Sequence, residues 1–240
     1  MAITQHNRTL QIESSPLGKD VLLLEAFQGR EALSELFTFE LELLSEKGDI
    51  DPKRLVGKSL TFSLQLADGS KRHFNGQVRR FSRGPAMANS TARHYRAELV
   101  PWLWFLTRRS NCRIFSQKSV KDIIEKVFRD SGFTEFKFQL GTALAKREYC
   151  VQYRETDFAF VSRLMEEQGL FYYFRHQAGK HELVVADAAT AYQDCPEKQI
   201  EYFPGDMASD RILRWDHSYE FRSGKWAQND YNFETPGNTL

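Results

Sequence analysis

The sequence predicts a β-rich α+β protein, in which an antiparallel barrel or sandwich precedes a region that mixes strands with helices. Three observations support this fold class. Short segments that alternate apolar and polar residues recur along the chain, and phenylalanine is unusually frequent, at 19 of 240 residues. Only two segments carry the spacing of an amphipathic helix, which favours strands over a helical bundle.

Residues 1–105 are predicted to form the first barrel-like domain. Two strand-like runs come first and are joined by a Pro-Leu-Gly turn. Residues 37–46 alternate cleanly, so their phenylalanines and leucines share one face and their glutamates the other. Residues 59–83 predict a hairpin that turns at Asp68 and Gly69, and a further strand ends at Pro101.

Residues 106–208 are predicted to form an α/β region with two helices. The first helix follows Ser119, a favoured N-cap residue, and stops before Gly132. Its apolar side chains share one face: Val120, Ile123, Ile124, Val127 and Phe128. Short strands surround the second helix, and a hairpin turns at Ala178 and Gly179.

Residues 209–240 are predicted to begin a second barrel-like domain. Strand-like alternation resumes at residues 211–226, after a looser stretch that starts at Asp187. No closing element is visible towards Leu240, so this barrel is expected to be incomplete. An unclosed barrel leaves strand edges exposed.

The segment from Tyr153 to Phe174 raises the question of an acid/base site, because it contains four carboxylates, two arginines and many aromatic residues. Its apolar residues fall on one stripe of a helix over residues 157–168, which Thr156 can cap and Gly169 can end. The carboxylates are therefore predicted to lie on the exposed face of a helix: Glu155, Asp157, Glu166 and Glu167.

The composition argues against nucleic-acid and membrane partners. The net charge is +1, and two small basic clusters, residues 78–83 and 107–113, are too short for a phosphate track. No apolar run approaches the roughly 18 residues of a membrane span, and the N-terminus lacks the apolar core of a secretory signal. Three scattered cysteines, Cys112, Cys150 and Cys195, predict reduced thiols and a cytosolic protein.

No catalytic, cofactor-binding or metal-binding residues are predicted. The Gly-Lys-Ser run at residues 57–59 lacks the first glycine of a phosphate-binding loop, because Pro52 stands there. His176 and His181 lie on opposite arms of the predicted hairpin and could bind a metal weakly. The sequence supplies no further ligand at a suitable spacing, so exposed histidines are the preferred hypothesis. The acidic residues from 187 to 201 lack a calcium-binding pattern.

Three blocks of the sequence resemble the N-terminal part of the VgrG family, the spike proteins of bacterial type VI secretion systems. The family pattern Y-x-E-T/S-D-x-x-F-x-x-R-L-x-E-x-x-G-I/L-x-Y-x-F is met by Tyr153, Glu155, Thr156, Asp157, Phe160, Arg163, Leu164, Glu166, Gly169, Leu170, Tyr172 and Phe174. Residues 100–128 resemble a second block and residues 230–236 a third. The blocks follow the family's order, and the similarity covers almost the whole chain.

The resemblance implies a phage-hub-like fold, in which barrel-like tube domains flank an α/β region. It implies a structural hub and not an enzyme: three chains form a ring that stacks on the Hcp tube and delivers effectors by puncturing. Baseplate components and effectors or their adaptors are the further partners, and no cofactor is implied. Assembly is expected in the cytoplasm, followed by secretion through the type VI system without a signal peptide or stable membrane insertion of this region.

Several alternatives stay open. Family members continue into an oligonucleotide/oligosaccharide-binding-type domain and a β-helix spike, so the resemblance implies that this chain is a fragment or a truncated form. A hub protein of a contractile phage or phage-derived tail would share the fold. An enzyme, such as a wall hydrolase or lipase, would require a cleft with convergent carboxylates. A ligand-binding barrel would require a large closed cavity.

Overall fold

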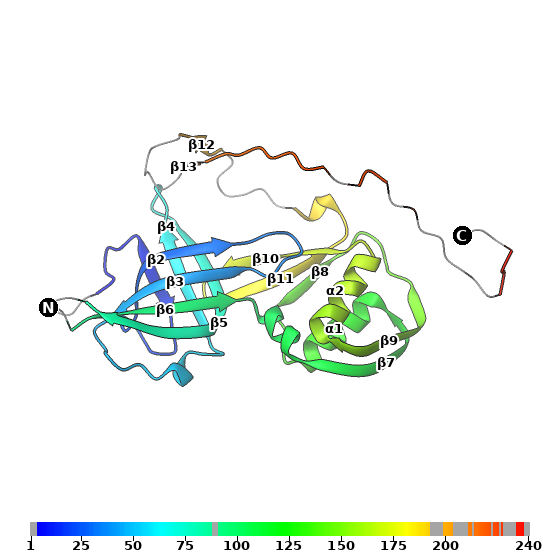
Figure 1. Cartoon of the computed structure of the whole chain (residues 1–240), viewed down its shortest axis with the longest axis horizontal. Coiled ribbons are helices and arrows are strands. Elements are labelled where there is room, and N and C mark those ends of the chain that lie inside the picture. Colours follow the sequence, from blue (N-terminus) through cyan, green and yellow to red (C-terminus); the bar gives the residue numbers. More distant parts are fainter. Residues whose placement is uncertain are drawn as a thin grey trace. The chain divides into compact units, whose positions relative to one another are not determined.

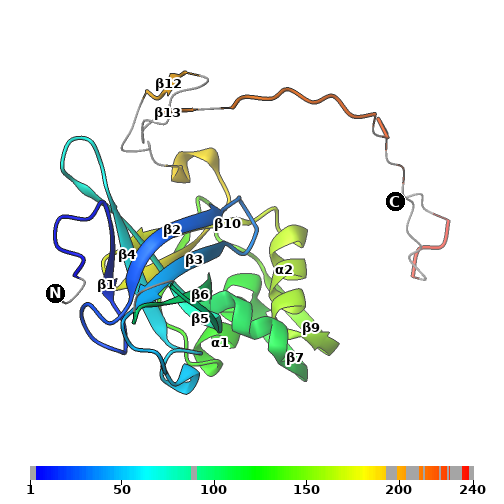
Figure 2. The ribbon, with the colours of Figure 1, turned by 60° about the vertical axis from the view of Figure 1, so that its left-hand side comes forward.

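A computed structural model describes residues 4–87, 91–192, 199–203, 211–212, 214–221, 223–225, 227 and 234–237. The chain divides into two compact units, Met1–Pro196 and Glu197–Leu240, and each is described by itself. In the first unit, a curled sheet lies beside a region that holds both α-helices (Figure 1, Figure 2). The prediction of a β-rich α+β fold is confirmed.

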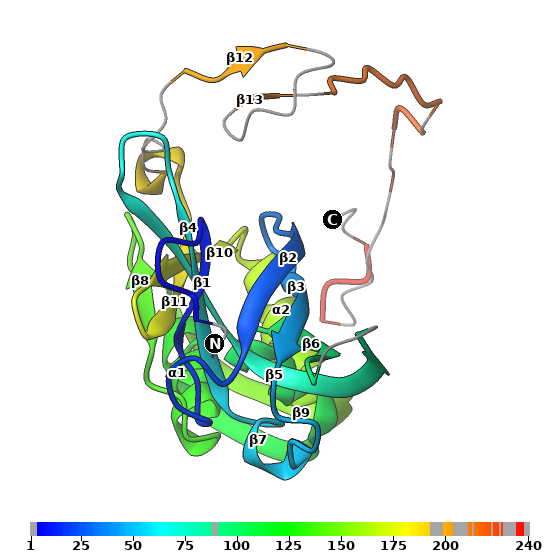
Figure 3. The same cartoon turned by 90° about the vertical axis from the view of Figure 1, so that its left-hand side faces the viewer.

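Six antiparallel strands form the sheet of the N-terminal half: β1 (Leu10–Ser14), β2 (Leu23–Arg30), β3 (Thr38–Ser45), β4 (Ser59–Gln65), β5 (Lys71–Ala86) and β6 (Arg93–Val100). Their order across the sheet is β1-β4-β5-β6-β3-β2, and a short 3-10 helix, η1 (Pro52–Arg54), lies between β3 and β4. The sheet curls into a half-barrel that brings β1 and β2 close together (Figure 3).

The curl depends on β5, the longest strand. Its first half pairs with β4 and its second half with β6, so it belongs to both walls of the half-barrel. The register shifts between Val78 and Arg80 and again between Arg83 and Ala86. Such bulges bend a strand and increase its twist, which allows one continuous strand to turn the corner.

The alternation predicted for residues 37–46 is confirmed. Phe39, Leu41 and Leu43 are buried, while Glu40 and Glu42 are exposed. The buried face contributes to a core in which aromatic rings pack edge-to-face, tilted or stacked: Phe27, Phe37, Phe39, Phe62 and Phe74. The high phenylalanine content therefore supplies the packed interior of the half-barrel.

The following half begins with the 3-10 helix η2 (Trp102–Arg108) and holds two small sheets. Its elements are β7 (Ser110–Ser119), α1 (Val120–Asp130), β8 (Phe136–Gln139), β9 (Lys146–Thr156), α2 (Asp157–Glu167), β10 (Phe171–Gln177), β11 (Lys180–Ala186) and η3 (Ala189–Ala191). Strands β7 and β9 form an antiparallel ribbon, and β10-β11-β8 form a sheet in which β11 and β8 are parallel.

The predicted helix boundaries are confirmed by their capping contacts. Ser119 and Asp122 form a reciprocal capping box at the start of α1, and Thr156 accepts a hydrogen bond from the backbone of Ala159 in α2. Gly132 and Gly169 follow the helices with φ of 85° and 65°, the left-handed conformation that glycine adopts without strain. Within the described residues, neither helix nor any other is long and apolar enough to cross a bilayer.

The second unit contains less strand than its alternation predicts. Its described strands are β12 (Glu201–Tyr202) and β13 (Arg211–Ile212), which pair in parallel. Residues 214–221 lie in neither helix nor strand, and Tyr219 and Phe221 are almost fully exposed. Alternation indicates which face a strand can bury, but a strand forms only beside a neighbouring strand. The described residues contain no strand that pairs with residues 214–221. Most of the third family block, residues 230–233, lies outside the described residues.

The close passage of β5 and β6 yields a stability prediction. A Cβ at Gly76 would lie 2.9 Å from Cβ of Leu99 and 3.2 Å from the Val100 carbonyl oxygen, whereas one at Gly48 would meet nothing within 4 Å. We expect Gly76→Ala to lower the free energy of unfolding by about 1–3 kcal/mol, because overpacking forces the strands apart. Gly48→Ala, the matched control, should change it by less than about 0.5 kcal/mol in urea unfolding. Equal effects of the two substitutions would contradict the tight packing.

Candidate functional site

The family-like segment spans the end of β9, all of α2 and most of β10. Glu166 and Glu167 lie on the exposed face of α2 as predicted, whereas Glu155 lies near the end of β9 and is half-buried. Glu155 pairs with Arg163 at 2.7 Å, and Glu167 pairs with Arg163 at 3.1 Å and with Arg147 at 2.7 Å. Partial burial raises the pKa of Glu167, but its hydrogen bonds from Arg147 and Arg163 outweigh this and hold that pKa below its usual value. Glu167 is therefore held in its ionised form and is not suited to act as a general acid.

The prediction is wrong for Asp157, whose side chain is fully buried. The carboxylate faces the β7–β9 ribbon and accepts hydrogen bonds from Arg113 at 2.5 Å, Gln152 at 2.9 Å and Asn111 at 3.1 Å. The guanidinium of Arg109 lies 3.9 Å away. Periodicity along the helix could not reveal these donors, because Asn111 and Arg113 come from β7, more than 40 residues earlier in the chain, and Gln152 comes from the strand before the helix.

The Asp157 cluster is a structural joint between α2 and the ribbon. Both carboxylate oxygens are occupied by donors of the protein, and Nε of Arg113 also donates to Oε1 of Gln152 at 2.8 Å. A buried carboxylate satisfied in this way holds the two strands against the start of the helix. It offers no open side to a substrate.

His176 and His181 are cross-strand partners in the β10–β11 hairpin, as predicted, but the prediction that they are exposed is wrong. His181 is 2% exposed and the side chain of His176 is 8% exposed. The hairpin packs against β5, and there the histidines meet Asn75 and the ring of Phe37. This burial could not be predicted from the hairpin alone, because Asn75 lies about a hundred residues away in the chain.

Asn75 and His181 form a polar centre inside the protein. The Nδ1–H of His181 donates to Oδ1 of Asn75 at 2.7 Å, and its Nε2 accepts the backbone N–H of Trp102 at 3.0 Å. The Nδ2 of Asn75 donates to the hydroxyls of Thr61 at 2.7 Å and Ser59 at 2.9 Å. These contacts require a neutral imidazole, and burial lowers the pKa of His181 to about 3.

His176 completes this junction from the other side of the hairpin. Its Nδ1 accepts the backbone N–H of Asn75 at 3.2 Å, and its Nε2 lies 2.9 Å from a carboxylate oxygen of Glu31. Among the described residues, no group of three or more histidines, cysteines and carboxylates is placed to hold a metal ion. The two histidines therefore tie β5 to the hairpin, and the described residues do not support the weak metal site considered for them.

The other residues that the sequence analysis considered for phosphate, calcium or thiol chemistry are located as follows. Residues 57–59 lead into β4, and no helix follows them to receive a phosphate. Asp187 accepts the backbone N–H groups of Gly141 and Thr142. Cys112 is exposed and Cys150 is buried. The other acidic and sulfhydryl candidates at 194, 195 and 197 lie outside the described residues.

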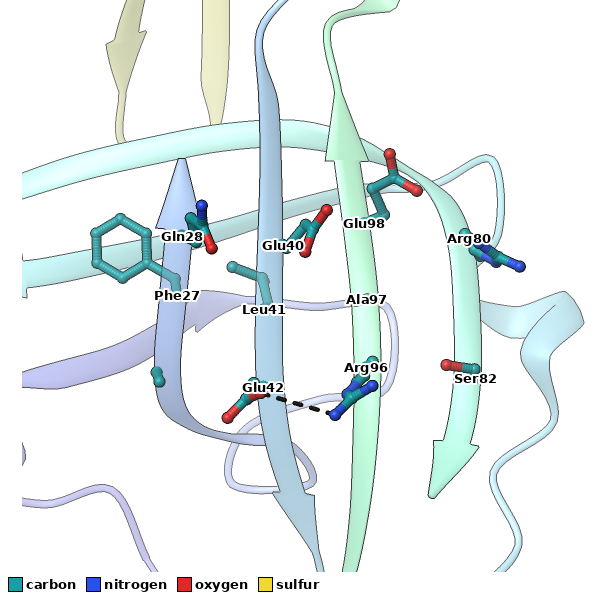
Figure 4. Close-up of a pocket in the computed structure, with 11 residues that line it drawn as sticks. Phe27, Gln28, Glu40, Leu41, Glu42, Arg80, Ser82, Arg96, Ala97 and Glu98 are labelled. Atoms are coloured by element: carbon teal, nitrogen blue, oxygen red, sulfur yellow. Dashed lines mark ion pairs between the residues drawn. The ribbon is translucent and has the colours of Figure 1, made fainter. Parts of the chain in front are cut away.

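A groove of about 760 Å³ crosses the outer face of β2, β3, β6 and β5 (Figure 4). Strand pairing places its polar side chains in two rows across the sheet: Gln28, Glu40, Glu98 and Arg80 in one, and Ala26, Glu42, Arg96 and Ser82 in the other. Arg96 lies 4.0 Å from Glu42, and Arg79 pairs with Glu98 at 2.5 Å. The alternation predicted this polar face, but the pairing register that aligns the rows was not predictable.

The groove presents both signs of charge on an open sheet face. Its carboxylates and guanidiniums alternate in sign and largely neutralise one another, and it is broad and open. The described residues that line it include no histidine or cysteine, and the carboxylates Glu42 and Glu98 both lie beside arginines. Mixed charges on an open sheet face favour recognition of a complementary polar protein surface.

Comparison with known proteins gives a consistent set of relatives. A family model described as phage tail baseplate hub (GPD) matches residues 30–240. The type VI secretion system spike proteins VgrG1b and VgrG1c of Pseudomonas aeruginosa are 45% and 43% identical over 244 residues, which cover all of this chain and 32% and 33% of those proteins. The chain thus spans about a third of the length of these relatives.

A solved structure with a similar fold is that of the Escherichia coli c3393 protein. It is described as a component of the type VI secretion system with structural similarity to the T4 bacteriophage tail proteins gp27 and gp5. Its TM-score is 0.65 at 26% sequence identity, over 77% of this chain and 50% of that chain. The predicted resemblance to VgrG spike proteins is confirmed.

The neutral state of His181 predicts a pH-dependent stability. Its pKa of about 3 lies below the 6.5 of an unfolded histidine, so the unfolded chain binds a proton below pH 6.5 that the native state excludes. The stabilisation is complete above pH 6.5 and is lost as the pH falls towards 3. From pH 7 to pH 5, we expect His181 alone to lower the free energy of unfolding by about 2 kcal/mol.

Urea unfolding at pH 7, 6 and 5 measures this loss. In His181→Gln, the loss of unfolding free energy between pH 7 and pH 5 should be smaller by about 2 kcal/mol. In the control His6→Gln, the loss should equal that of the wild-type protein, because His6 is exposed. Identical pH profiles for the wild-type protein and His181→Gln would show that another group carries the effect.

The buried cluster predicts a large cost for removing its carboxylate. Asp157→Ala leaves Arg113 and Gln152 without their acceptor, so the free energy of unfolding should fall by about 3–5 kcal/mol. The control Glu166→Ala, on the exposed face of the same helix, should cost less than about 0.5 kcal/mol. Chemical denaturation of both variants measures the difference, and a cost near that of the control would mean that Arg113 finds water instead.

Proposed function

The chain belongs to the phage tail baseplate hub family, and we propose that it builds the hub of a type VI secretion spike. The observation that carries this proposal is the extent of the similarity: the alignment to spike proteins covers the whole chain at 45% identity. The relatives have a structural spike or hub role, and this role agrees with a family-like segment in which Glu155, Asp157 and Glu167 are paired with arginines.

In this proposal the chain has three parts. Residues 1–105, which contain the half-barrel, form the first tube domain, and residues 106–208 form the α/β region. Residues 209–240 begin the second tube domain. The two hydrophobic cores support the first division, because one is built from residues before Val100 and the other starts at Trp102.

The assembled hub is proposed to be a homotrimer that stacks on a ring of the Hcp tube. Such an assembly needs broad, complementary surfaces and no reaction chemistry. The outer face of β2, β3, β6 and β5 supplies one such surface, with its alternating charges. Baseplate components and effectors or adaptors are the further proposed partners, and the protein is proposed to assemble in the cytoplasm and leave through the type VI system.

The alternative proposal is the hub of a contractile phage or phage-derived tail. It is favoured by the family description itself and by the similarity to phage tail proteins described for the Escherichia coli structure. Both proposals assume the same fold. They differ in whether the hub belongs to a type VI secretion system or to a phage tail. A culture that lacks the protein should stop releasing Hcp into the medium only if the secretion role is correct.

The hub proposal predicts the mass of the full-length protein that contains this chain. Light scattering over a wide concentration range should give a stable trimer, and the trimer should co-sediment with Hcp. A full-length monomer at all concentrations would remove the threefold hub from the proposal, because no ring could form.

A charge reversal tests the groove within that assembly. Glu42→Lys places two cations side by side, since Glu42 faces Arg96 across the strands. We expect the variant to weaken either trimer formation or binding to Hcp at least tenfold, because the added cation creates like-charge repulsion. Asp49→Lys reverses a charge on an exposed side chain outside the groove and serves as the control. Equal association of Glu42→Lys and Asp49→Lys would show that the groove does not contribute to assembly.

A further inference from the structure

Strand β1 lies at one end of the six-stranded order, so one of its two edges has no strand beside it in that sheet. Its other edge pairs with β4, where the carbonyl of Thr9, directly before β1, accepts the backbone N–H of Gln65 at 2.9 Å. Backbone groups alternate between the two edges along a strand, so Ile12, three residues after Thr9, turns its N–H and C=O to the outer edge. An unpaired edge of this kind is a template for pairing with another chain.

The side chain of Gln5 occupies this outer edge. Its Nε2 donates to the carbonyl oxygen of Ile12 at 2.8 Å, and its Oε1 accepts the backbone N–H of Ile12 at 2.8 Å. A primary amide carries the same donor and acceptor as a peptide group, so it fills both positions that a neighbouring strand would take. Unlike a strand, the side chain ends there and offers no further ladder. Gln5 is 6% exposed, so both bonds are shielded from water.

The backbone of Gln5 is held in place for this contact. Its N–H donates to Oδ1 of Asp20 at 3.3 Å, and its carbonyl accepts the N–H of Arg8 and Nε2 of Gln11, each at 3.2 Å. Asn7, inside this turn, has a φ of 62°, a left-handed conformation that asparagine tolerates better than most residues. The N-terminal segment, β1 and the loop before β2 thus act together to place one side chain.

The edge that Gln5 covers is suited to pairing with its own copy. If two β1 strands met antiparallel about a twofold axis at Ile12, the two Ile12 residues would exchange their N–H and C=O groups. This register sets Gln11 of each strand opposite Glu13 of the other, so no like charges face each other. A hollow of about 700 Å³ lies along β1 and the N-terminal segment, so this edge is close to the protein surface.

From these observations we propose that the side chain of Gln5 prevents β1 of one molecule from pairing with β1 of a second copy. While the amide is bonded to Ile12, the groups that would join the two strands are occupied. When the amide is removed, the N–H and C=O of Ile12 lose their partners, and pairing with a second copy restores both. The contact is twofold and does not build a threefold ring. The inference rests on residues 4–20 and does not depend on the hub proposal.

Self-association of the variant Gln5→Ala of this chain tests the proposal. Sedimentation velocity over a wide concentration range should show a dimer whose dissociation constant is at least tenfold lower than that of the wild-type protein. Amide hydrogen exchange reports on the edge directly, and the Ile12 N–H should exchange slowly in the wild-type protein at every concentration. In Gln5→Ala it should exchange at least tenfold faster in dilute samples and become protected again as the dimer forms.

A second variant separates the loss of the amide from the pairing of the strands. Gln5→Lys also removes the bonds to Ile12, but it places two ammonium groups near the twofold axis, where they repel each other. This variant should stay monomeric while its Ile12 amide exchanges fast. The matched control Ser45→Ala removes two hydrogen bonds of another buried side chain in the same sheet, to Val21 and Lys47, and should not dimerise. A cooperative urea transition in dilute samples confirms that each variant is folded.

Four results would overturn the proposal. Fast exchange of the Ile12 amide in the wild-type protein would show that Gln5 does not cover the edge, and this measurement needs no variant. A Gln5→Ala protein that stays monomeric would show that the uncovered edge does not pair. Dimers of Ser45→Ala would assign the association to lost stability, and dimers of Gln5→Lys would assign it to a different surface. Each of these outcomes leaves the trimer measurement on the full-length protein unaffected, so the two proposals fail separately.

Discussion

The side-chain amide of Asn75 is the interaction on which the rest of the structure depends. It lies in the first half of β5, where the half-barrel meets the β10–β11 hairpin, and it forms hydrogen bonds both to side chains of β4 and to His181 of the hairpin. Hydrogen bonds are directional, whereas the surrounding phenylalanine packing is not, so the amide fixes how the hairpin sits on the sheet. The cost of burying it is offset because its oxygen and its nitrogen both find partners.

Features that depend on neighbours along the chain were predictable from the sequence. The caps Ser119 and Thr156, and the glycines that follow both helices, act within a few residues and were found where the sequence put them. The same holds for the alternating face of β3 and for the turn at Gly69. The family resemblance extended this local information to the hub fold, because a long ordered pattern is more specific than any of its parts.

Features that depend on distant partners were not predictable. Asp157 begins a helix that also carries exposed carboxylates, and its burial depends on contacts with β7, more than 40 residues earlier in the chain. From the sequence alone, His181 is a polar residue of a hairpin. Its burial depends on the contact of that hairpin with Asn75 of β5. The groove on the outer face likewise needs the register of four strands. A single sequence describes what a side chain can do, and topology decides which partner it meets.

The long strand β5 has a consequence for mechanical load. It pairs with β4 along its first half and with β6 along its second, and Asn75 in the first half is bonded to the hairpin. A force directed along β5 would load these ladders in shear, so that many hydrogen bonds resist together. A force across it would open them one after another. The half-barrel is therefore stiffest along the direction of this strand and weakest at right angles to it.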